Sequence, residues 1–168
     1  MTRSRAKQRG NGLVEFTLST IPLIFLLISI FEISRGMWIY HTINYAIQRG
    51  ARFSIVHGQV CGGASASCAV TVGTVAQVIR DNSAGMDGSQ FDVVLTSQST
   101  TQTCAPLSSC YTNTQPWPPS SDSHPGFALT IYGTYPFRTP LSMFWPGSGA
   151  SHVQGVNLSA KSTEEIRF

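Results

Sequence analysis

A predominantly apolar stretch near the start of the chain, from Leu13 to Ile33, constrains the fold more than any other feature. An α-helix of this length, rising about 1.5 Å per residue, spans about 31 Å, which matches a hydrocarbon core of about 30 Å. No charged residue lies between Phe16 and Phe31. A secretory signal peptide has a shorter apolar region of about 7–15 residues. The stretch therefore predicts a retained transmembrane helix, rather than a signal peptide or a buried core helix.

The charges around this stretch predict its orientation. The leader, residues 1–10, holds four cations, whereas the following 158 residues carry seven basic and eight acidic side chains. Because Lys and Arg gather on the cytoplasmic side of membrane helices, we expect the N-terminus in the cytoplasm and the C-terminal part outside it. The cations form a short leader and not a basic folded face, which argues against nucleic-acid binding.

Side chains suited to a membrane–water interface follow the stretch. Glu32 and Arg35 stand at i, i+3 on a helix and are predicted to pair there. Trp38 and Tyr40 are typical interfacial anchors. The expected segments are a leader over 1–10, a transmembrane helix over 11–35, its extracytoplasmic continuation over 36–58 and a small domain over 59–168.

Glu15 does not fit a simple membrane anchor, because a carboxylate inside a bilayer is costly. If the chain were cut after Gly10, Asn11 would carry a new α-amino group, largely protonated at neutral pH. Glu15 would then neutralise that amine, in its own chain or in a neighbouring subunit. The alternative is a glutamate that reaches to the lipid headgroups.

These residues resemble a known family. Arg9-Gly10, Asn11 and Glu15-Phe16 form the class III prepilin pattern. The segment GLVEFTLSTIPLIFLLISIFEISRGMW is similar to the N-terminus of TadE-like minor pseudopilins of tight-adherence (Flp) pilus systems, and 47–58 and 130–146 resemble later parts of that family. The resemblance implies cleavage after Gly10 by a prepilin peptidase and an assembly role for Glu15 and Phe16. Gly12 is a rival cleavage position, and 59–125 resembles no family.

The helix is predicted to continue beyond the membrane, to about 45 residues in all. An apolar stripe recurs at helical spacing from Ile39 to Phe53, and Gly58 is a reasonable C-cap. Pro22 removes one helical hydrogen bond and is tolerated in membrane helices. Arg49 and Arg52 lie away from the stripe, either as a solvated face or as a contact for a partner.

The rest of the chain predicts a small α+β domain, which with the long helix makes a pilin-like architecture. Helical spacing runs from Val72 to Ile79. Alternating apolar residues over 91–95, 127–137 and 156–160 predict three or four antiparallel strands, covered on one face by the long helix. Residues 97–126 are rich in Ser, Thr, Pro and Gln and predict a long surface loop.

Four cysteines, Cys61, Cys68, Cys104 and Cys110, follow the membrane helix. The predicted topology places them in an oxidising compartment, where disulfides form. Three pairings are open, and the local one, Cys61–Cys68 with Cys104–Cys110, is favoured. Zinc is disfavoured, since no CxxC motif or suitably spaced histidine is present, and we expect no metal.

No catalytic motif of a known hydrolase, nucleotide-binding or metalloprotease type is present, and the four histidines are scattered. We therefore expect a non-enzymatic structural minor pseudopilin without cofactors. It would lie in the inner membrane as a single-pass protein and contact lipid, the prepilin peptidase, other pilin subunits and the assembly platform. The alternative is a bitopic membrane protein whose extracytoplasmic domain binds a ligand or an envelope component.

Overall fold

The computed structural model describes residues 8–58, 70–139 and 155–167. They form two compact units, one ending at Met37 and the other beginning at Trp38. Helix α1 (Gln8–Val56, 49 residues) runs through both units, so the predicted long helix is present. It begins three residues before the predicted start at Asn11, and it contains Pro22. Gly58 is not a left-handed cap, because the described glycines with positive φ are Gly85 and Gly126.

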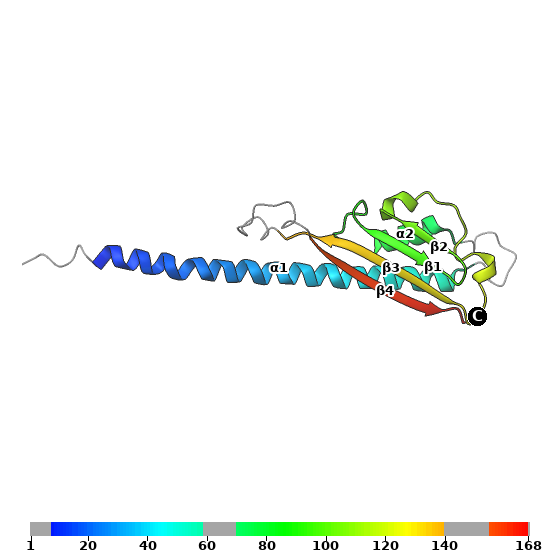
Figure 1. The fold of residues 1–168 in the computed structure, drawn as a ribbon, viewed down its shortest axis with the longest axis horizontal. Helices are drawn as coiled ribbons and strands as arrows, with labels where there is room; N and C mark the ends of the chain where they lie inside the picture. Colours follow the sequence, from blue (N-terminus) through cyan, green and yellow to red (C-terminus); the bar gives the residue numbers. More distant parts are fainter. Residues whose placement is uncertain (1–7, 59–69, 140–154, 168) are drawn as a thin grey trace, which may run out of the picture. The chain divides into compact units, whose positions relative to one another are not determined.

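The second unit is a four-stranded antiparallel sheet with two helices (Figure 1). Its strands are ordered β2-β1-β3-β4. The strands are β1 (Asp92–Thr96), β2 (Thr101–Cys104), β3 (Ala128–Phe137) and β4 (Val156–Glu165). Helix α2 (Val72–Asp81) is capped by Thr71, whose side chain accepts from the Thr74 backbone N–H while the Thr74 hydroxyl accepts from the Thr71 N–H. This capping box supplies partners for N–H groups that the helix itself leaves free.

The C-terminal part of α1 provides one wall of the core. Ile43, Ala46, Ile47 and Ala51 are fully buried, and their spacing follows the predicted stripe. Gly50 belongs to the same face, where a side chain would bring its Cβ within 2.6 Å of Ile79 Cγ1. The lack of a Cβ there therefore lets α1 and α2 approach closely.

Alternating strand residues provide the opposite wall. Val93 and Leu95 on β1 and Leu129 and Ile131 on β3 are buried, as the alternation predicts. Gly133 on β3 is paired with Val93 and lies against Ile47, since a Cβ there would approach Ile47 Cδ1 to 2.7 Å. The predicted α+β class, with a long helix covering one sheet face, is confirmed.

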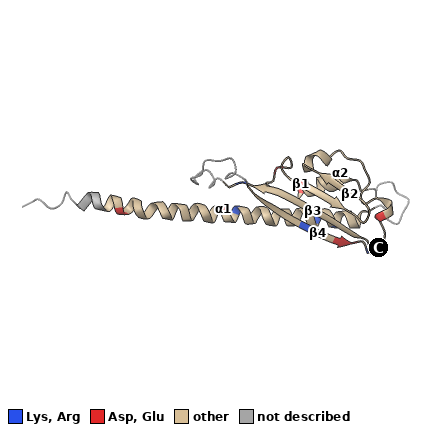
Figure 2. Cartoon of the chain, in the orientation of Figure 1, with Lys and Arg blue, Asp and Glu red and all other residues tan. Residues whose placement is uncertain are grey.

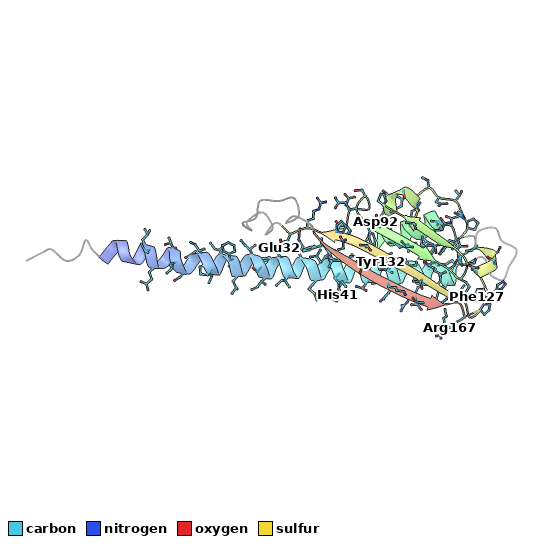
Figure 3. All side chains as sticks on the ribbon, viewed as in Figure 1. Glu32, His41, Asp92, Phe127, Tyr132 and Arg167 are labelled. Carbon is cyan, nitrogen blue, oxygen red and sulfur yellow. A yellow bond between two sulfur atoms is a disulfide. The ribbon has the colours of Figure 1, made fainter. Side chains whose placement is uncertain are left out.

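The other sheet face is rich in threonine. One cross-strand row on this face joins all four strands: Thr101, Thr96, Thr130 and Thr163. The hydroxyls of Thr130 and Thr163 lie 2.9 Å apart, within hydrogen-bond distance. Tyr132 stands in the next row and is 42% exposed (Figure 3). Polar β-branched residues thus suit an antiparallel sheet that is solvated on one side.

The prediction of a long surface loop over 97–126 is wrong. This segment contains β2, which extends the sheet, and the 3₁₀ turns η2 (Leu107–Cys110) and η3 (Ser120–Asp122). Leu107 is fully buried and Trp117 is 1% exposed. The composition of this segment was misleading for two reasons. Threonine occurs in loops but also favours strands, and the two large apolar residues, Leu107 and Trp117, are isolated in the sequence.

Candidate functional site

The N-terminal part of α1 exposes an apolar surface along its whole length. Between Leu13 and Phe31, large hydrophobic side chains are 38% to 75% exposed. Figure 2 shows almost no charged residues along this part of the helix, and Figure 3 shows its side chains pointing outward from the helix. From Gly12 onward α1 is long and apolar enough to cross a membrane, and none of its most apolar window is buried. This exposed apolar surface is larger than the apolar patches of soluble monomers, as expected of a surface that contacts lipid or another protein.

Three hydroxyl side chains within this surface donate hydrogen bonds to backbone carbonyls of the preceding turn. Thr17 donates to the carbonyl of Val14 at 2.9 Å, and Thr20 donates to that of Phe16 at 2.7 Å. Ser29 donates to the carbonyl of Phe25 at 2.8 Å. A hydroxyl that bonds to the preceding turn needs no water, so these residues remain compatible with a hydrocarbon environment.

Glu15 is the exception on this surface. It is exposed, and no ion pair or hydrogen bond joins it to another residue whose side chain the structure describes. Asn11 precedes it by four residues on the same helix, and residues spaced i, i+4 lie one above the other. The backbone of Gly10 and Asn11 belongs to α1, so the predicted cleavage site falls inside the helical segment.

The predicted interfacial residues follow the apolar surface. Glu32 Oε2 lies 3.4 Å from Arg35 Nη2, and the Glu32 side chain is 16% exposed. One turn further on, Trp38 is 66% exposed, and Tyr40 is 42% exposed. A carboxylate paired with a cation, followed by exposed aromatic rings, has the composition expected of a membrane boundary.

The cysteines are partly described. Cys104, at the end of β2, forms a disulfide with Cys110 in η2. Both residues are buried, at 0% and 6% exposure. The local pairing is therefore present for these two cysteines, whereas Cys61 and Cys68 lie outside the described residues. The bond fastens the end of an edge strand to the turn that follows it.

Replacing Cys110 and Cys104 together by Ser is expected to lower the free energy of unfolding by about 2 kcal/mol, from the loop-closure entropy of the unfolded chain. Chemical denaturation of the full chain in detergent, followed by far-UV circular dichroism, measures this change. Because both sulfurs are buried, the native protein should resist alkylation under mild reduction. Rapid labelling of Cys104 in the folded protein would contradict this expectation.

Asp122 is a site that the sequence analysis did not detect. This buried carboxylate accepts from the Ser97 hydroxyl at 2.5 Å, from the Ser99 backbone N–H at 2.8 Å and from the Ser99 hydroxyl at 2.7 Å. These donors favour the charged form and lower the pKa of Asp122 to about 2. The cluster ties η3 to the β1–β2 turn, so its evident role is structural. Its serines are 25 and 23 residues away in sequence, which hides it from motif searches.

Asp122 should make the stability of the fold decrease at low pH. A carboxylate whose folded pKa is lowered stabilises the fold above its unfolded pKa of about 3.8, and this contribution disappears as pH falls toward 2. Asp122→Asn should cost about 2 kcal/mol at pH 7, the magnitude of hydrogen bonds to a charged group. The difference in denaturation midpoint between wild type and variant should shrink between pH 4 and pH 2. A constant difference over that range would contradict this account.

The other titratable groups that the structure describes lie apart from one another in local contacts. His57 stacks on Phe53 with ring centroids 4.6 Å apart, and Asp81 accepts from Arg80 at 2.8 Å. Asp87 accepts from the Ser89 backbone N–H, which lowers its pKa, as in a turn. Within the described residues, no group of three or more His, Cys, Asp or Glu side chains is arranged to hold a metal ion.

Comparisons with known proteins bear on the N-terminal helix. The model of a family described as TadE-like protein matches residues 10–52. This segment includes the exposed apolar surface, Glu15, the Glu32–Arg35 pair and the first part of the core-facing stripe. No curated protein and no solved structure matched the chain significantly. From Gly10 to Arg52 the chain is therefore similar to TadE-like proteins, the family that its sequence resembles.

Proposed function

We propose that this protein is a structural, non-enzymatic minor pseudopilin of a tight-adherence pilus or of a related secretion machine. The observation that carries the proposal is the TadE-like match over a helix whose apolar surface is exposed. Before assembly this surface would contact lipid, and afterwards it would contact the helices of other subunits. The same surface would serve in both states because lipid tails are about as apolar as side chains such as leucine.

The proposed topology follows from charge and chemistry. Residues 1–10 would lie in the cytoplasm of a single-pass inner-membrane protein, and the domain with the sheet would lie outside it. The Cys104–Cys110 disulfide fits that placement, because such bonds persist in oxidising compartments. The partners would be lipid, a prepilin peptidase that cuts after Gly10, other pilin subunits and the assembly platform.

The intact mass of the protein purified from native membranes tests the proposal. A pseudopilin should lack residues 1–10 and begin at Asn11, and Edman sequencing should read Asn-Gly-Leu-Val-Glu. An intact Met1 would favour the bitopic membrane protein with a ligand-binding domain. A start beyond Ile33 would indicate a cleaved signal peptide and would exclude both functions.

A further inference from the structure

The side of α1 that faces away from the core carries a straight row of side chains. We call this surface the outer stripe, and it consists of Trp38, Thr42, Tyr45, Arg49, Arg52 and Val56. With 3.6 residues per turn, these positions fall within a sector about 80° wide, on the opposite side of the helix from Ile47. Trp38 is 66%, Tyr45 48% and Val56 57% exposed.

The spacing within the outer stripe is that of a helix–helix contact. Trp38, Tyr45 and Arg52 recur every seven residues, as do Thr42, Arg49 and Val56. A row of this spacing can pack against a neighbouring helix, and Trp38, Tyr45 and Val56 supply the apolar side chains that such packing needs. Trp, Tyr and Arg are also the residue types most enriched at the energetic centres of interfaces.

A groove in two parts flanks the outer stripe on the side of α2. One part is lined by Tyr45 and Phe53 of α1, by Val78 of α2 and by Asn82, the residue that follows α2. The next part is lined by Trp38, with Tyr45 and Asn82 again. Both parts lie beside the outer stripe and share Tyr45 and Asn82 in their linings, so side chains of a second helix packed on the stripe could enter them.

Arg49 is held in position on the outer stripe. Its Nε donates to the Tyr45 hydroxyl at 2.9 Å, and its guanidinium carbon lies 5.1 Å from the centre of the Tyr45 ring. Neither Nη group has a hydrogen-bond partner among the described residues. A guanidinium fixed in this way presents two donors that match the two oxygens of a carboxylate.

Arg49 and Arg52 make the outer stripe positively charged, and nearby carboxylates neutralise little of this charge. Arg52 Nε is 4.0 Å from Glu164 Oε1, a long contact between partly exposed groups, and such pairs contribute little. Asp81, at the edge of the groove, is bound to Arg80. A second copy of this chain, packed through the same surface, would bring Arg49 and Arg52 against their equivalents. Like charges across an interface oppose association, so this surface does not suit self-pairing.

We infer that the outer stripe is the docking surface for a helix of a different subunit, one that carries carboxylates opposite Arg49 and Arg52. This inference rests on the proposed function in one respect: two membrane-anchored subunits would bring their helices alongside each other. Trp38, Tyr45 and Val56 would supply the apolar contacts, and the arginines would select an acidic partner over a second copy.

The test uses the full chain in phosphatidylcholine nanodiscs and two fluorescent synthetic peptides. Both peptides are three-heptad helices with Leu at a and d, and they carry either Glu or Lys at every e and g position. Fluorescence anisotropy should show the Glu peptide binding at least about tenfold more tightly than the Lys peptide, as a coupling of about 1.4 kcal/mol requires. Exchanging both arginines, Arg49→Glu with Arg52→Glu, should invert this preference.

Matched variants distinguish peptide binding through the outer stripe from attraction to the overall charge of the protein. Lys161→Glu, on the other face of the sheet, should keep the preference for the Glu peptide. Tyr45→Phe removes the hydroxyl that holds Arg49 and should weaken Glu-peptide binding severalfold without changing the fold. Equal binding of both peptides, no binding of either, or an unchanged preference in the double variant would overturn the inference. The inference would also be overturned if the wild-type protein self-associated and the Arg49→Glu variant did not. None of these readouts depends on leader cleavage or on pilus assembly, so the proposed function can fail separately.

Discussion

Glu15→Ala is expected to abolish the recovery of this protein with other pilus subunits while its abundance in the membrane stays normal. The substitution removes a carboxylate from an exposed apolar helix, so insertion should be unharmed or slightly improved. The sheet-bearing unit begins at Trp38 and does not include residue 15, so its disulfide and its thermal melt should be unchanged. Association should fail because the protonated Asn11 amine of an incoming subunit loses its partner.

The magnitude of this effect depends on the surroundings of the pair. Away from water, two opposite charges attract more strongly than at a surface, although desolvation offsets part of the gain. An amine left without its carboxylate is costly, and we expect partner recovery to fall at least about tenfold, which corresponds to 1.4 kcal/mol. Glu15→Gln keeps the shape without the charge and should fail nearly as completely.

Co-purification from membranes with equal amounts of each variant measures the loss. Thr17→Val is a suitable control, because among the described residues the Thr17 hydroxyl bonds to the Val14 carbonyl alone and carries no charge. Undiminished recovery of partners with Glu15→Ala would show that Glu15 merely reaches to the headgroups, and the bitopic alternative would then gain support.

Gly10→Val is expected to leave the leader attached and so to remove the mature protein altogether. The proposed peptidase must hold the peptide bond after residue 10 in its site, and a glycine places no side chain there. A β-branched residue would obstruct that approach. In mass spectrometry the variant should retain residues 1–10, whereas the wild type should begin at Asn11.

Gly12→Val is the matched control for this experiment, because Gly12 is the rival cleavage position. A Cβ at Gly12 meets no atom within 4 Å, so the substitution should not disturb α1. We expect cleavage of this variant after residue 10 as in the wild type. Normal processing of Gly10→Val together with a block in Gly12→Val would move the site and make Glu15 the third residue of the mature chain.

Much of the architecture was predictable because it depends on local patterns. The long helix follows from 21 residues of apolar sequence and from the spacing beyond it. Strands β1 and β3 follow from the alternation of buried residues such as Val93, Leu95 and Ile131. These signals survive in sequence because a helix or a strand half-buried on one side repeats its environment every 3.6 or 2 residues.

Segment 97–126 shows where local patterns fail. β2 has four residues, and one of them, Cys104, is fully buried, so it offers no alternation to detect. Trp117 is buried although only prolines flank it in the sequence, and Asp122 is held by serines more than 20 residues away. Each of these features depends on a contact between segments distant in sequence, which no window of neighbouring residues contains.

Local patterns were enough to predict that α1 can span a membrane and that Ile43 and Ile47 face a core, because hydrophobic burial and helical periodicity are local. Which polar side of α1 stays exposed depends instead on how distant elements pack against the helix. α2 and the sheet cover the side of Gly50, while Tyr45 and Arg49 stay uncovered and bond to each other. A sequence shows which residues can be buried, but packing between distant elements decides which exposed residues remain available to a partner.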